Sequence, residues 1–95
     1  MTEYFVVQDP DGPDLEFEGE LLVDDNFHDV GFVKVYRTEG GSYVLTQNLS
    51  TRPGQVVLRR TRVLASAEEL VELLGHSTGA KAVAAKLGVA TRRRI

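Results

Sequence analysis

Residues 32–47, FVKVYRTEGGSYVLTQ, constrain the fold more than any other part of the chain. Two runs in which apolar and polar side chains alternate flank a turn that contains Gly40 and Gly41. Alternation on both sides of a glycine turn is typical of a β-hairpin. The segment therefore predicts two paired antiparallel strands at the centre of the fold.

Two registers are open for this hairpin. If residues 39–40 form the loop, Tyr36 lies opposite Tyr43, whereas a loop at residues 40–41 places Tyr36 opposite Leu45. Aromatic pairs across two strands stabilise a sheet by tenths of a kcal/mol, up to about 1 kcal/mol. We therefore favour the first register.

Three further segments are predicted to be strands, because they are rich in β-branched and aromatic residues or alternate in polarity. They are residues 3–7, 15–23 and 55–64. The second of these strands places three glutamates on one face and mostly apolar side chains on the other. Polar segments with Pro, Gly, Asp or Asn separate the strands and predict loops at residues 9–14, 24–29 and 48–54.

The hydrophobic period changes from 2 to 3.6 after residue 65. Ser66 and Glu69 form a capping box, which begins a helix, and Gly75 is placed to end it. A second, less apolar helix is expected at residues 80–87.

Strands followed by helices predict an α+β fold, in which an antiparallel sheet of about five strands precedes two carboxy-terminal helices packed on one face. The 95 residues are expected to form one domain, with residues 89–95 as a basic tail or a short edge strand.

Composition narrows the class of protein. The chain has no cysteine, so disulfides and thiolate metal sites are excluded, and its first residues do not resemble a signal peptide. No segment has the roughly 20 apolar residues of a membrane-spanning helix. We therefore expect a cytoplasmic protein without membrane contact.

The charges are unevenly distributed along the chain. Residues 1–50 hold 11 acidic and 2 basic side chains, whereas residues 51–95 hold 3 acidic and 9 basic side chains. This asymmetry indicates either an interaction surface or neutralisation between neighbouring strands.

The hairpin is apolar on both faces, and two helices can cover only one of them. An exposed apolar face usually needs a cover. We expect a second copy of the chain, or one other protein, to contact Phe32, Tyr36, Tyr43 and Leu45. The alternative is that the amino-terminal strand and the segment 24–29 fold over this face.

Chemical signatures are weak throughout the chain. His28 lies among three aspartates, but neighbouring residues in a loop seldom converge on a metal, so we expect a solvated loop. Glu16, Glu18 and Glu20 form a charged face that we expect to lie opposite Arg60 and Arg62. We therefore assign no catalytic, cofactor-binding or metal-ligating residue and expect a non-enzymatic interaction or regulatory domain.

A nucleic-acid-binding function is the alternative. Residues 81–91 resemble the first helix and turn of a helix-turn-helix, but the chain ends before a recognition helix could form. We favour a helix end followed by a basic tail. The residues that would contact nucleic acid are Arg59, Arg60, Arg62, Arg92, Arg93 and Arg94.

Three motifs together resemble the EXLDI proteins, a bacterial family. They are FEGELL at residues 17–22, VYRTEGG at residues 35–41, and LGV at residues 87–89 with Ile95 at the end. Of the Glu-x-Leu-Asp-Ile ending that names the family, only Ile95 matches. The family has no assigned activity, so the resemblance implies no catalytic residue, and it implies a short final strand in place of a recognition helix.

Overall fold

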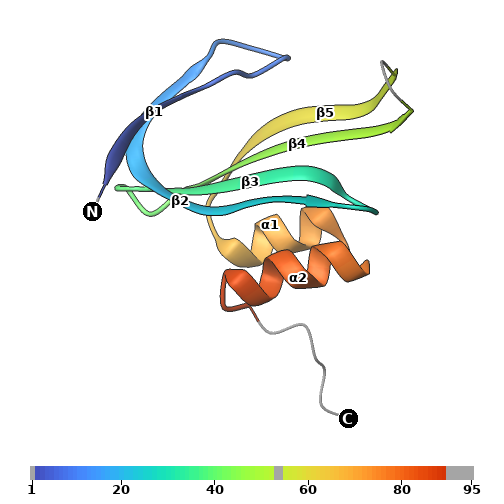
Figure 1. Cartoon of the computed structure of the whole chain (residues 1–95). Helices are drawn as coiled ribbons and strands as arrows, with labels where there is room; N and C mark the ends of the chain where they lie inside the picture. Colours follow the sequence, from blue (N-terminus) through green and yellow to red (C-terminus); the bar gives the residue numbers. More distant parts are fainter. Residues whose placement is uncertain (1, 53–54, 90–95) are drawn as a thin grey trace.

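A computed structural model describes residues 2–52 and 55–89, with only the backbone at residues 51–52 and 55–57. The chain forms five strands in an antiparallel sheet of order β1-β2-β3-β4-β5, followed by two helices (Figure 1). The elements are β1 (Glu3–Val7), β2 (Leu15–Phe27), β3 (Gly31–Thr38), β4 (Tyr43–Arg52), β5 (Gln55–Leu64), α1 (Ala67–Leu74) and α2 (Thr78–Lys86). The predicted α+β fold is confirmed.

The β3–β4 hairpin is present, but both predicted registers are wrong. Tyr36 lies opposite Val44, and Tyr43 lies opposite Arg37. Thr38 and Ser42 close a loop of three residues, with hydrogen bonds from Thr38 N to Ser42 O (2.8 Å) and from Gly41 N to Thr38 O (3.0 Å). Gly41 has φ 88°, as the last residue of a three-residue hairpin loop requires. One residue more or less in this loop exchanges the faces of Val44 and Leu45.

Strand β2 is longer than predicted and changes face along its length. It continues to Phe27, so most of the predicted loop at residues 24–29 is strand. Its register against β3 shifts between Leu21 and Val23, where a bulge adds one residue. Val23 therefore turns toward the helices, whereas simple alternation places it with Phe17 on the opposite face.

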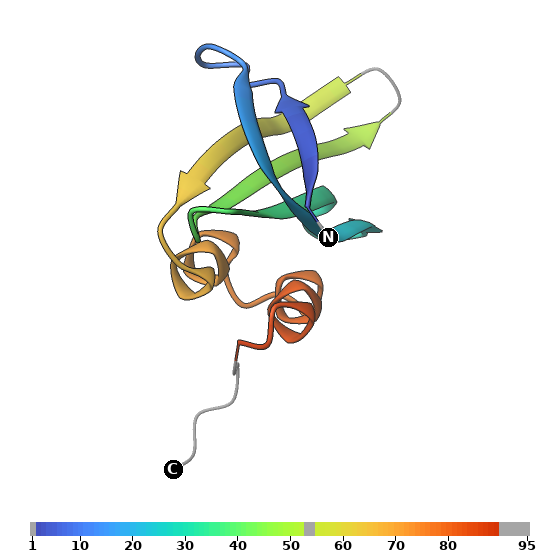
Figure 2. The ribbon, with the colours of Figure 1, turned by 90° about the vertical axis from the view of Figure 1, so that its left-hand side faces the viewer.

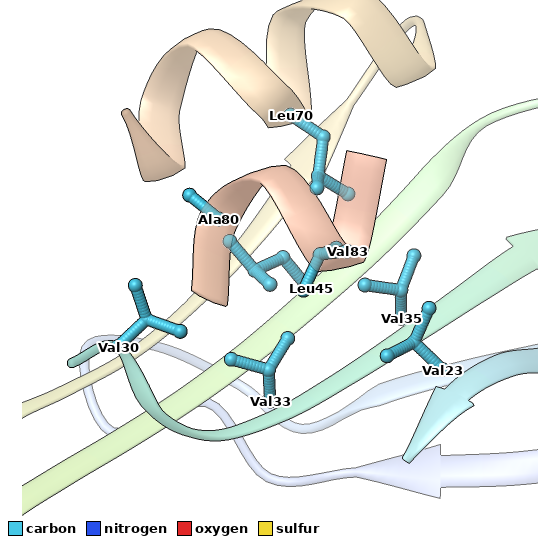
Figure 3. Packing of buried hydrophobic residues seen from close by; sticks show 8 residues of the cluster. All are labelled: Val23, Val30, Val33, Val35, Leu45, Leu70, Ala80 and Val83. Carbon is cyan, nitrogen blue, oxygen red and sulfur yellow. The ribbon is translucent and has the colours of Figure 1, made fainter. Parts of the chain in front are cut away.

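The helices cover one face of the sheet. The Ser66 hydroxyl accepts from Glu69 N at 3.2 Å, and the Glu69 carboxylate accepts from Ala65 N at 3.2 Å, so the predicted cap starts α1. Fully buried Leu70 and Val83 reach the sheet from α1 and α2. The cluster that they complete is shown in Figure 3 and comprises Val23, Val30, Val33, Val35, Leu45, Leu70, Ala80 and Val83.

The other face is covered by the chain itself. The sheet curls so that the β1–β2 hairpin crosses over β4 and β5 (Figure 2). Phe5, Phe17 and Tyr36 meet there, with ring centroids 4.9 to 5.7 Å apart. The Thr61 hydroxyl of β5 donates to Gln8 O just beyond β1 at 2.8 Å, which ties the two edges of the curled sheet together. The amino-terminal strand therefore supplies the cover that a partner was expected to supply.

Candidate functional site

The concave face of the curled sheet carries a row of exposed side chains beyond the part that the β1–β2 hairpin covers. Residues opposite one another in paired strands share a face. The pairings Asn26 with Phe32, Phe32 with Asn48 and Asn48 with Arg59 therefore align four side chains from β2 to β5. All four are exposed. An amide, a phenyl ring, a second amide and a guanidinium thus follow one another across the sheet.

A second row lies beside the first, one step closer to the covered region. It runs from Asp24 through Lys34 and Thr46 to Thr61. Thr61 is buried beneath the end of β1, whereas Lys34 and Thr46 are half-buried. Lys34 and Thr46 of this row line a depression together with Phe32, Asn48 and Arg59 of the first row.

This depression is a hollow of about 370 Å³ between the end of β1 and strands β3 to β5. We call it the concave groove and define it by Phe32, Lys34, Thr46, Asn48 and Arg59, which all line it. A second hollow of about 480 Å³ lies next to it, toward the β2–β3 turn. Phe32 and Asn48 border both hollows, so a molecule in the groove can extend past the ring into the second hollow.

Positive charge is moderate in the groove. Lys34 and Arg59 contribute two cations, and Asp24, opposite Lys34 on β2, places one carboxylate beside the hollow. The Lys34 ammonium lies 5.8 Å from the centroid of the Phe32 ring, within the range of a cation–π contact. Burial, and then the charge of Asp24, raise the pKa of Tyr36, so the phenol at the inner wall stays neutral.

The four residues predicted to form one protein interface do not share a surface. Leu45 is fully buried beneath the helices, and Tyr36 is buried in the aromatic cluster. Tyr43 packs against the helix-side cluster, on the face opposite Tyr36. Phe32 is 43% exposed. The expectation of a shared face is wrong because the hairpin loop has three residues and not two.

The arginines predicted to contact nucleic acid are also separated. Arg59 lies along the concave row, opposite Asn48. Arg60 instead donates to the Gln47 side chain at 2.8 Å and to Leu73 O at 3.4 Å. Burial, and then Arg62, lower the pKa of Arg60. The Arg62 guanidinium lies 3.6 Å from the Asp11 carboxylate. Arg92, Arg93 and Arg94 lie outside the described residues.

The acidic residues have other neighbours than predicted. Glu20 pairs with Arg37 at 3.3 Å, and β2 is not adjacent to β5, so the pairing of Glu16, Glu18 and Glu20 with Arg60 and Arg62 is wrong. The expected neutralisation between neighbouring acidic and basic strands is wrong for the same reason.

The aspartates near His28 hold helix α2. Asp25 pairs with Lys86, and the Asp29 carboxylate accepts from Gly79 N at 2.8 Å. That hydrogen bond is the main cause that lowers the pKa of Asp29. Within residues 2–52 and 55–89, no group of three or more His, Cys, Asp or Glu residues is arranged to hold a metal ion.

Sequence reasoning named two residues of the site, Phe32 and Arg59, but placed them on different surfaces. The pairing register of strands β3, β4 and β5 is the information that brings the two residues onto one surface. Counting outward from a three-residue loop places Phe32 opposite Asn48, and counting from the β4–β5 turn places Asn48 opposite Arg59. Neither count is available until the loop lengths are known.

Comparisons with protein-family models, with curated proteins and with solved structures find no significant match to this chain. The resemblance to EXLDI proteins therefore stays a prediction. Neither helix in the described part of the chain is long and apolar enough to cross a membrane.

Proposed function

We propose that this chain is a small cytoplasmic, non-enzymatic binding domain that holds an anionic partner in the concave groove. The observation that carries the proposal is the convergence of Phe32, Lys34, Asn48 and Arg59 from three neighbouring strands on one hollow. Elsewhere the β1–β2 hairpin covers this face of the sheet, and the opposite face is covered by the helices. On the concave face, the groove is thus a part where polar and aromatic groups remain available to a ligand.

The chemistry of the lining favours an anion. A guanidinium and an ammonium both donate charge-assisted hydrogen bonds to phosphate or carboxylate oxygens, and these bonds are stronger than neutral ones. The amide of Asn48 can donate and accept. These groups bind and orient a ligand, and none of them pairs a nucleophile with a base. This composition supports recognition more than catalysis.

The charge of the groove also limits the ligand. Two cations and one nearby carboxylate suit one anionic group better than a long polyanion, whose binding depends on many neutralised phosphates. Arg60 borders the hollow, but its guanidinium donates to the Gln47 side chain and to Leu73 O. The Arg62 guanidinium faces the Asp11 carboxylate. A nucleic acid bound here should therefore show a shallow dependence of affinity on salt, which a gel shift across a salt series measures.

The proposal is tested by titrating the full chain with inorganic phosphate and following backbone amide shifts. We expect saturable shifts that cluster at Phe32, Lys34, Asn48 and Arg59, and that Arg59→Gln removes. Arg37→Gln is the matched control, because Arg37 is exposed on β3 and pairs with Glu20 away from the groove. Shifts that are scattered over the chain, or that survive Arg59→Gln, contradict the proposal.

Self-association is a second candidate, and edge strand β1 favours it. Tyr4 and Val6 are 60% and 55% exposed on the outer side of this strand, whose free edge can pair with a second copy. If a dimer forms there, Tyr4→Glu should convert it to monomer in sedimentation experiments. Val63→Glu, at a 57% exposed position on β5, should leave it intact. A wild-type chain that sediments as a monomer at micromolar concentration removes this candidate.

A further inference from the structure

We infer that the anionic partner is a nucleotide unit, meaning a planar base joined to one phosphate, with the base stacked on Phe32 and the phosphate held by Arg59 and Lys34. This inference rests on the proposed function and adds the aromatic half of the ligand. Its starting point is an exposed phenyl ring that stands at the shared wall of two hollows. An exposed ring on a sheet is the usual platform on which nucleic-acid-binding proteins stack bases.

The neighbours of the ring support a base rather than a plain aromatic group. Asn26 lies opposite Phe32 on one side and Asn48 on the other, so the ring has an amide on each flanking strand. Each amide offers two donors and one acceptor oxygen, which matches the mixed hydrogen-bonding edges of a base. A benzene ring or an aliphatic chain would leave both amides without a partner on the ligand.

Spacing allows one ligand to reach both the ring and the guanidinium. Phe32 on β3 and Arg59 on β5 are two strand spacings apart, or roughly 10 Å between backbones. Long side chains shorten that gap, and Lys34 reaches toward the ring from the next row. The hollow of about 370 Å³ is within the size range of small-molecule sites.

The carboxylate of Asp24 disfavours additional phosphates. It lies opposite Lys34 on the neighbouring strand, beside the hollow that Lys34 lines, and offsets part of the positive charge there. A second or third phosphate adds negative charge close to Asp24 without adding a cation. We therefore expect a nucleoside monophosphate to bind at least as tightly as the corresponding triphosphate.

The experiment is a calorimetric and NMR titration of the full chain with adenosine and uridine monophosphates, adenosine, inorganic phosphate and a single-stranded oligonucleotide. We expect at least one monophosphate to bind roughly tenfold or more tightly than both phosphate and adenosine, because stacking and charge pairing add. Phe32→Ala should weaken monophosphate binding roughly tenfold while leaving phosphate binding unchanged. Arg59→Gln should weaken both.

Leu21→Ala is the matched control for the ring, because Leu21 is 42% exposed on β2 and lines neither hollow. Asn48→Ala is a second variant that tests the base-binding edge without removing the ring. Circular dichroism spectra of each variant verify the fold.

The possible outcomes separate the two proposals. Phosphate binding that depends on Arg59, with no gain from a base and no effect of Phe32→Ala, overturns the nucleotide inference and leaves the proposed function intact. An absence of binding by every probe overturns both. Binding of the oligonucleotide but not of the monophosphates, sensitive to Phe32→Ala, supports the inference and identifies a single strand as the source of the unit.

Discussion

Replacing Phe17 by alanine tests the way in which the sheet covers its own second face. Phe17 lies on β2 and contacts Phe5 and Tyr36, with ring centroids 5.7 and 5.4 Å away. This cluster holds the β1–β2 hairpin against the concave face. If it is the main contact of the hairpin, removing one of its three rings should destabilise the whole domain and loosen β1 first.

The expected magnitude follows from burial. Phenylalanine to alanine substitutions in cores cost about 3–5 kcal/mol in total, ring contacts included, and Phe17 is only half-buried, so a value at or just below the lower end of that range applies. Its two ring contacts are each worth about 0.5–1.5 kcal/mol beyond the buried area. We expect a loss of about 2–3 kcal/mol. For a domain of this size, that lowers the melting temperature by roughly 10–20 °C.

The assay is urea unfolding followed by circular dichroism, with amide hydrogen exchange to locate the loosened strand. Phe32→Ala is the matched control, because it removes the same ring from a position that is 43% exposed. It should cost less than about 1 kcal/mol. Equal losses for the two variants, or protection in β1 that survives Phe17→Ala, would show that the aromatic cluster does not close the sheet.

Three further predictions concern other parts of the fold. In urea melts, Leu70→Ala should cost about 3–4 kcal/mol, because Leu70 is fully buried, whereas the more exposed Leu73→Ala should cost about 1 kcal/mol. Gly31→Ala should cost about 3 kcal/mol, because its Cβ overlaps the β4 backbone at a φ of 80°. Gly41→Ala, where a Cβ meets open space, should cost only the strain of about 1–2 kcal/mol. The lowered pKa of Asp29 stabilises the fold above the unfolded-state pKa of about 4, and this contribution is lost as the pH falls. Thermal melts from pH 7 to pH 2 should therefore show a deficit in Asp29→Asn that disappears in acid. A deficit that does not change with pH contradicts this origin.

Local signals in the sequence were sufficient to predict which elements form, although β2 and β4 continue through most of the loops predicted at residues 24–29 and 48–54. Strands β1 and β5 have the predicted bounds, and Ser66 caps α1 as the capping box indicated. These features depend on residues that are near one another in the chain, so propensity and periodicity describe them well. Helix α2 begins two residues earlier than expected, at Thr78, because Ser77 accepts from Ala80 N and caps it.

The errors arose where a single residue decides which face a strand presents. A hairpin loop with one more residue placed Leu45 under the helices and Val44 among the aromatic residues. A bulge at Leu21–Val23 did the same within β2. Because side chains alternate with a period of two, each such change exchanges the two faces for every residue that follows. Polarity alone did not reveal either change, since both faces of the hairpin are apolar.

The curl of the sheet has the largest consequence for function, and Gly19 makes it possible. A Cβ at this position would overlap the Arg37 carbonyl, so β2 passes β3 there more closely than a side chain allows. The bulge follows directly after, and bulges increase the twist of a strand. Together they turn the first half of β2, with β1, across the concave face.

This arrangement changes what the apolar hairpin implies. In a flat sheet, the face with Tyr36 and Val44 would need a partner protein, and the polar row from Asn26 to Arg59 would lie on open surface. In the curled sheet, the apolar half of that face is buried by β1 and β2, and the end of β1 becomes a wall beside the polar half. The fold that removes the need for a protein cover is therefore the same fold that gives Lys34 and Arg59 a groove to face.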